Sequence, residues 1–113
     1  MKIIVCALIS IFVTSSVFAA ESWERVKIPA DVEKGIKAYA AKEWPGDFAM
    51  QLFTVKKERI GFQKMTSFKT QFKADELTMA IIKQAEEDWP DNYEMQVYQF
   101  MKQIKAYYEL NQS

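Results

Sequence analysis

The sequence has almost no cysteine and no histidine. Its 113 residues include one cysteine, Cys6, and not a single histidine. Cys6 lies inside an N-terminal segment with the features of a signal peptide, so the chain that follows has neither residue type. A disulfide scaffold, a thiol nucleophile, an imidazole base and an ordinary structural zinc site are therefore excluded for that part. We expect no metal site and no cofactor.

The segment 1–19 has the three parts of a secretory signal peptide. Lys2 gives the positive start, Ile3 to Val13 form an apolar run, and Val17 to Ala19 match the small-x-small cleavage pattern. We expect cleavage near Ala19 and an exported protein, either periplasmic or secreted. An uncleaved membrane anchor is the alternative, and the shortness of the apolar run disfavours it.

An excess of charge of one sign is also lacking. The chain has 15 basic and 15 acidic side chains, and removing Lys2 with the signal segment leaves 14 basic against 15 acidic. A balance so close to zero gives no overall field that would attract DNA or anionic lipid. Together with the expected export, this argues against a nucleic-acid partner.

Glycine and proline are scarce, with three of each. Turn dipeptides of the hairpin type are absent, and alternation of apolar and polar residues nowhere persists, so strands are poorly supported. Catalysis is also poorly supported, because the acids Glu86, Glu87 and Asp88 are sequential and would point in different directions on a helix. We expect an all-α protein that is not an enzyme.

What the sequence does contain is an internal duplication. Residues 43–52 read EWPGDFAMQL, and residues 88–97, 45 positions later, read DWPDNYEMQV. Each copy predicts a helix–turn–helix, because the proline disfavours helical geometry in the tryptophan before it. A turn this short makes the two helices an antiparallel hairpin. Asp47 and Asp91 or Asn92 are candidate caps of the second helix of each hairpin.

The sequence thus predicts two duplicated antiparallel helical hairpins, with a repeat of about 45 residues, packed as a small four-helix bundle. Residues 20–29 form a flexible lead-in, and 30–113 form the helical domain, with hairpins at about 30–66 and 75–111. The predicted helices span about 30–43, 47–65, 75–88 and 91–110. Whether residues 66–74 are helix or loop stays open. Two copies are fewer than a free-standing solenoid needs, so the hairpins should pack together or pair across a dimer.

Apolar residues at helical spacing mark the expected core face of each helix. These faces are Val32, Ile36, Ala40 and Trp44; Phe48, Leu52, Val55 and Phe62; Leu77, Ile81, Ala85 and Trp89; and Tyr93, Val97, Phe100, Ile104 and Tyr107. The alanines should allow close approach of another helix, and the tryptophans are expected to pack at the corners. The repeated Gln51 and Gln96 are expected to hydrogen-bond the preceding turn.

Charge is unevenly distributed along the chain. Residues 54–73 hold six basic side chains and one acidic, whereas residues 75–94 hold seven acidic and one basic. The simplest interpretation is that the two stretches face each other or face solvent. The alternative function is binding of an anionic envelope surface, lipid or polymer, through a basic patch of Lys56, Lys57, Arg59 and Lys64.

The last predicted helix carries a second apolar stripe beside its core face, made of Tyr98, Met101 and Tyr108. A helix that is apolar nearly all round is either central or covered by something, so the stripe is either a protein interface or buried in the bundle. Tyrosine and methionine suit adaptable interfaces. We expect an exported, non-enzymatic protein that binds an unknown protein or a second copy of itself. An inhibitor, a chaperone or an accessory subunit of the cell envelope would fit.

Overall fold

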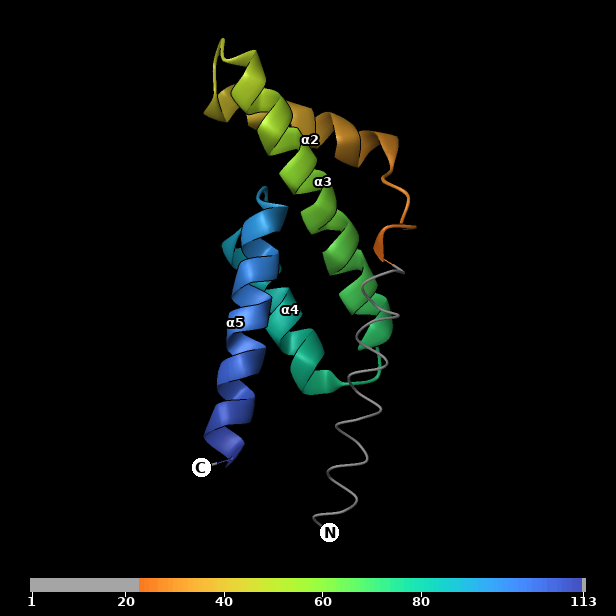
Figure 1. The fold of residues 1–113 in the computed structure, drawn as a ribbon. Coiled ribbons are helices and arrows are strands. Elements are labelled where there is room, and N and C mark those ends of the chain that lie inside the picture. The colour runs from red at the N-terminus through yellow and green to blue at the C-terminus, as the bar shows by residue number, and fades with distance from the viewer. Residues whose placement is uncertain (1–22, 113) are drawn as a thin grey trace.

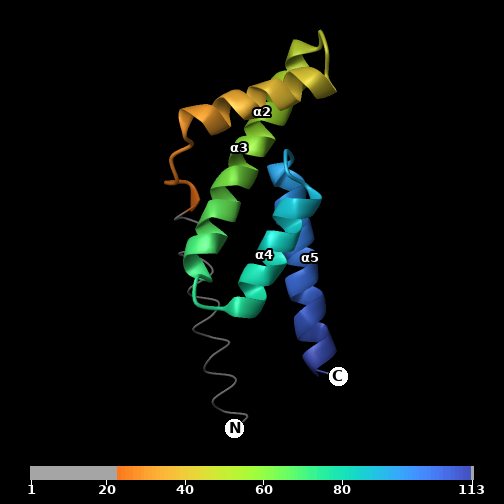
Figure 2. The ribbon, with the colours of Figure 1, turned by 180° about the vertical axis from the view of Figure 1, so that it is seen from behind.

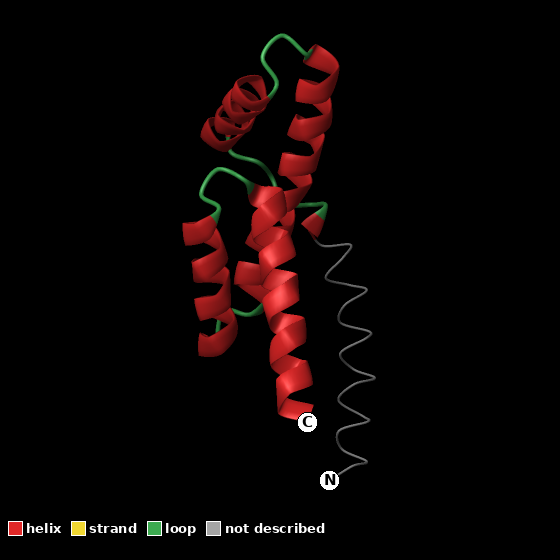
Figure 3. Cartoon of the chain, turned by 90° about the vertical axis from the view of Figure 1, so that its left-hand side faces the viewer, coloured by secondary structure: helices red, strands yellow, loops and turns green. Residues whose placement is uncertain are grey.

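The computed structural model describes residues 23–112, which form an all-α bundle (Figure 1). Its main elements are α2 (Ala30–Glu43), α3 (Phe48–Gln71), α4 (Glu76–Asp88) and α5 (Tyr93–Gln112). No strand occurs among these described residues (Figure 3). The predicted four-helix fold is confirmed, and three of the four helices lie within two residues of the expected bounds. The predicted signal segment, residues 1–19, lies outside the described residues.

The two hairpins are arranged along α3, the longest helix. The first half of α3 is crossed by α2, and its second half runs beside the hairpin of α4 and α5 (Figures 1 and 2). The described chain is elongated, with extents of 58 × 27 × 23 Å. Because α3 contacts α2, α4 and α5, it connects the two hairpins into one bundle.

Residues 66–74, for which the sequence did not decide between helix and loop, are mostly helical. The helix predicted to end near residue 65 continues to Gln71, and the backbone N–H of Phe72 still bonds the carbonyl of Phe68. Phe68 and Phe72 both pack on Phe100 of α5, with ring centroids 4.8 and 6.2 Å apart. Residues four apart share one helix face, so the extra turns of α3 carry two aromatic rings into the core.

The core consists of two clusters, one between α2 and α3 and the other between α3 and the second hairpin. The first contains Ile36, Ala40 and Val55, and the second contains Met65, Ile82 and Phe100. Ala40 and Ala85 lie at matching positions of the repeat and are both fully buried, as expected for sites of close helix approach.

The two corners of the repeat have the same geometry. Trp44 has φ −129° and ψ 65°, and Trp89 has φ −131° and ψ 63°. The Gln51 Nε2 donates to the Trp44 carbonyl at 2.8 Å, and the Gln96 Nε2 donates to the Trp89 carbonyl at 2.7 Å. The expected role of both glutamines in closing the preceding turn is confirmed.

The expected caps are also present. The side chain of Asp47 accepts from the backbone N–H of Met50 at 3.0 Å, and that of Asn92 accepts from Met95 at 3.0 Å. Each cap satisfies one of the N–H groups that a helix start leaves free. The duplicated sequence therefore encodes a duplicated turn.

The prediction that the two tryptophans lie on the core faces of their helices is wrong. Trp44 is 41% exposed and Trp89 is 37% exposed. Each follows the last helical residue and has non-helical backbone angles, so its side chain leaves the stripe that the helical spacing predicts. The Trp89 indole N–H instead donates to the side-chain oxygen of Gln99 at 2.8 Å.

Four further residues of the expected core faces are exposed. Phe48 is 77% exposed, Leu52 54%, Leu77 43% and Tyr107 38%. In α4 the buried residues are Thr78, Ile82 and Ala85, of which only Ala85 belongs to the predicted stripe, because α4 packs mainly on α5 and barely touches α3. The exposed apolar residues lie at the two ends of the bundle, where no further helix covers them.

Two glycines provide a matched test of the packing. A Cβ at Gly61 of α3 would lie 2.6 Å from the Tyr93 carbonyl carbon, whereas a Cβ at Gly35 of α2 would meet nothing within 4 Å. We predict that Gly35→Ala raises the free energy of unfolding by about 1 kcal/mol through helix propensity. Gly61→Ala should lower it by about 1–3 kcal/mol, because α5 must move away. Urea denaturation checks both values, and stabilisation by both substitutions would contradict the close contact.

Candidate functional site

The start of α5 is held against the middle of α3 by a buried carboxylate. Glu58 is only 3% exposed, and its two oxygens accept from the backbone N–H groups of Tyr93, at 2.5 Å, and Glu94, at 3.3 Å. These are two of the N–H groups that a helix start leaves unpaired, and the helix dipole favours a negative charge there. Glu58 therefore caps α5 from another helix.

Burial and hydrogen bonding shift the pKa of Glu58 in opposite directions. Burial raises the pKa of the Glu58 carboxyl above its ordinary value, and the hydrogen bonds from Tyr93 and Glu94 oppose this rise without cancelling it. A buried carboxylate with two donors is favourable geometry for a cap. It is also a group whose ionisation is coupled to folding.

The Tyr93 ring fills the space between the two hairpins. It packs against the first core cluster and makes an edge-on contact with Phe62, with ring centroids 5.3 Å apart and an interplanar angle of 81°. The neighbouring Asn92 donates from its side-chain amide to the hydroxyl of Tyr39 on α2 at 3.0 Å. We call this contact of the second hairpin's turn with α2 and α3 the hairpin joint.

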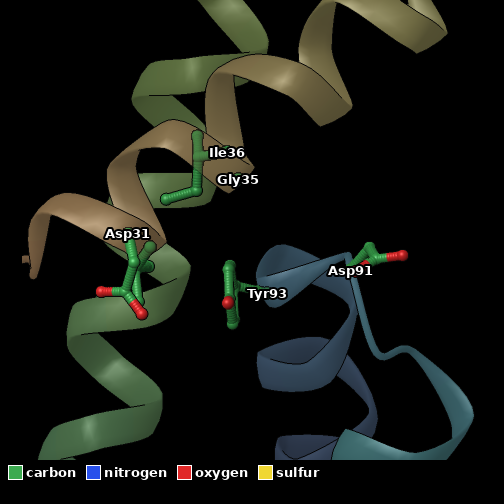
Figure 4. Close-up of a pocket in the computed structure, with 6 residues that line it drawn as sticks. Asp31, Gly35, Ile36, Asp91 and Tyr93 are labelled. Carbon is green, nitrogen blue, oxygen red and sulfur yellow. The ribbon is translucent and has the colours of Figure 1, made fainter.

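An open pocket of about 190 Å³ lies beside the joint, between α2 and the start of α5. Figure 4 shows the Tyr93 ring facing α2, with Asp31 on one side and the Asp91 carboxylate pointing away on the other. The two acids do not converge on one point, so the pocket lacks the paired carboxylates that acid–base catalysis uses. Within residues 23–112, no group of three or more histidines, cysteines or acids could hold a metal ion.

Most of the predicted basic patch is engaged inside the molecule. The Lys57 Nζ lies 3.5 Å from a Glu94 carboxylate oxygen and also lies over the Phe53 ring, 4.5 Å from its centroid. The Lys64 Nζ lies 5.2 Å from the centroid of the Trp23 ring. Lys56 is exposed.

Arg59, the fourth member of the patch, joins α3 to α2. Its guanidinium donates through two nitrogens to the Glu33 carboxylate, with the Nε 2.7 Å from one oxygen. This hydrogen bond lowers the pKa of Glu33. The fork-to-carboxylate geometry explains why a basic residue interrupts the apolar stripe of this helix.

Contacts between the helices explain part of the uneven charge distribution. Lys57 pairs with Glu94, and Lys69 pairs with Glu86 at 2.8 Å. Both pairs join the basic stretch 54–73 to the acidic stretch 75–94. The expectation that these stretches face each other is met at these two places.

The three residues of the α5 stripe are exposed. Tyr98 is 59% exposed, Met101 52% and Tyr108 52%. Tyr108 contacts Tyr107 edge-on, and the Lys102 Nζ lies 5.9 Å from the Tyr98 ring centroid. The stripe follows the face of α5 next to Glu94, so it continues outward from the hairpin joint.

The described part of the lead-in, residues 23–29, lies along α3. The side-chain amide of Gln63 donates to the carbonyl of Val26 at 2.9 Å. Trp23 lies beside Lys64, as noted above, so this tryptophan does contact the helical domain.

Sequence reasoning missed Glu58 and Gly61 as joint residues. Glu58 is the single acid within a stretch of six basic residues, and it lies three positions after the core residue Val55. An isolated acid on the edge of an apolar face is a signal that could have identified it. Gly61 lies a further three positions along the same face of α3.

No protein-family model, curated protein or solved structure matches this chain. Within residues 23–112, none of the helices combines the length and the apolar character needed to cross a membrane.

The raised pKa of Glu58 predicts a pH dependence of stability. An acid whose folded-state pKa lies above the unfolded value, about 4.3, contributes most below the unfolded pKa and loses that contribution as the pH rises through the folded pKa. Glu58→Gln cannot titrate and offers only one acceptor, so it should cost about 1–3 kcal/mol. We expect this cost to be greater near pH 4 than at pH 7.

Urea denaturation of both proteins at the two pH values measures the difference. A cost of Glu58→Gln that stays constant or shrinks on acidification would contradict the raised pKa. Gln103, the exposed residue of α5 at the matching repeat position, supplies the control: Gln103→Glu should change stability little at either pH, since solvent-exposed substitutions usually do.

Proposed function

We propose that this protein is an exported, non-enzymatic helical protein that acts by binding another protein through the α5 stripe. An inhibitor, a chaperone or an accessory subunit of the cell envelope is the kind of role that fits. The proposed site is Tyr98 and Met101, extended along the helix by Tyr108.

The observation that supports the proposal is that all three side chains, which share one face of α5, are exposed. Each is more than half exposed, although α5 is also a central element of the core. Contiguous apolar surface on a small domain typically marks a contact site, and aromatic residues and methionine are enriched in such sites.

The contacts of the basic patch argue against the alternative, binding of an anionic lipid or polymer. Lys57 and Arg59 have acidic partners, and Lys64 lies over an aromatic ring. An anionic surface would have to compete with these internal interactions. The net charge near zero gives no long-range attraction to help it.

The test is co-purification of the protein with its partner from an envelope extract, using the double variant Tyr98→Ser with Met101→Ser. We expect the variant to keep its helical circular dichroism and to lose the partner, because a polar stripe removes the apolar area buried at the interface. Retention of every association by the folded double variant would contradict the proposal.

A matched control separates the two hypotheses. Lys56→Ala with Lys64→Ala removes two charges of the basic patch and should leave the association intact. Raising the salt from about 50 to 300 mM should also have little effect, because screening weakens interactions between charges and not apolar burial. Strong loss of binding with salt or with the lysine variant would favour the anionic surface instead.

A further inference from the structure

Each side of the hairpin joint has an equivalent surface at one end of the described molecule, and the two equivalent surfaces do not contact each other. Because the hairpins are copies, each residue of the joint has an equivalent 45 positions away. Among residues 23–112, the second hairpin inserts its turn into the first, and no described segment inserts into the second hairpin. Within the same described part of the chain, the turn of the first hairpin does not dock into another hairpin (Figure 1).

The turn side of this unused joint is apolar and exposed. Tyr93 and Val97 of the second hairpin are half-buried, Tyr93 against the first core cluster and Val97 against the second. Their equivalents in the first hairpin are Phe48, which is 77% exposed, and Leu52, which is 54% exposed. We call Phe48 and Leu52 the turn face.

The receiving side is apolar and exposed as well. In the first hairpin, Val32, Phe62 and Met65 receive the second hairpin and are half-buried or buried. Their equivalents in the second hairpin form what we call the receiving face. It consists of Leu77, Tyr107 and Leu110, which are 43%, 38% and 77% exposed.

The polar residues of the joint have polar equivalents in the other copy. Asn92 and Tyr39 form a hydrogen bond in the joint, and their equivalents are Asp47, an acceptor, and Gln84, a donor. Glu58 corresponds to Gln103, whose amide oxygen can accept from a helix start. Gly61 corresponds to Ala106, whose methyl group would keep an incoming helix slightly farther away than in the joint.

We propose that the chain self-associates head to tail, with the turn face of one copy docking on the receiving face of the next. The partner is a second copy of this chain, because the two faces repeat the two sides of an interface that the molecule already makes internally. Repeat proteins need polar outer faces on their terminal repeats to remain separate, and here both outer faces are apolar. The contact is heterologous, so it can continue into a short row of copies.

This proposal does not depend on the α5 stripe. Tyr98, Met101 and Tyr108 correspond to Phe53, Lys56 and Gln63, none of which takes part in the hydrogen bonds or ring contacts of the hairpin joint. The two proposals can therefore fail separately.

Two single substitutions test the head-to-tail contact. Phe48→Asp places an acid in the first turn of α3, and Leu77→Asp places one in the first turn of α4, where the helix dipole favours it. Both side chains are exposed, so the fold should be kept, which circular dichroism checks. Phe48→Asp disrupts the turn face and Leu77→Asp disrupts the receiving face, and each leaves the other face intact.

The measurement is sedimentation velocity of the protein as the cell produces it, over about 1–100 μM. We expect the mass of the wild type to rise with concentration beyond that of two copies. Each variant alone should stay a monomer over this range, because the desolvated carboxylate weakens self-association about tenfold or more. An equimolar mixture of the two variants should form a dimer and nothing larger, because one intact interface remains.

Three results would overturn the proposal: a wild type that stays monomeric throughout, variants that associate as the wild type does, or a mixture that remains monomeric. Met101→Asp is the control, and it should associate like the wild type. Loss of self-association in that variant would assign the contact to the α5 stripe and would also overturn the head-to-tail arrangement.

Discussion

The carboxylate of Glu58 holds the start of α5 against α3, and the arrangement of the two hairpins depends on this contact. A helix hairpin by itself can bury only one side of each helix. By pairing with the N–H groups of Tyr93 and Glu94, Glu58 positions the second hairpin so that the Tyr93 ring completes the first core cluster. Gly61 allows the backbones to approach closely at the same point. Moving α5 outward would therefore break a buried hydrogen-bonding network and open both cores.

The same contact explains which surfaces remain available. Because α5 uses one face for the joint and its core, the neighbouring stripe of Tyr98 and Met101 faces solvent. Because most basic residues of α3 pair with acids or lie over rings, that helix offers little free positive charge. The described surface therefore combines exposed apolar side chains on α5 with little free positive charge on α3.

Local chemistry let the sequence predict the helices, the caps and the closed corners. A proline ends each first helix, and Gln51 and Gln96 bond the turn behind them wherever the hairpins lie. The tertiary arrangement was harder to predict, since periodicity shows that a face is apolar but does not show what covers it. Phe48 and Leu77 have the spacing of core residues and lie at open ends, whereas Glu58 has the chemistry of a surface residue and is buried. The α5 stripe was visible as a pattern, but its exposure required the positions of α3 and α4.

Amide hydrogen exchange at the start of α5 tests the role of Glu58 most directly. Amides in the first turn of a helix ordinarily exchange fast, because they have no partner within the helix. The repeat provides an internal reference: Phe48 and Ala49 occupy the matching positions at the exposed start of α3. The account predicts that, in the monomer, Tyr93 and Glu94 exchange much more slowly than Phe48 and Ala49. Equal, fast exchange at all four amides would mean that Glu58 does not hold α5, and the hairpin joint would have to be abandoned.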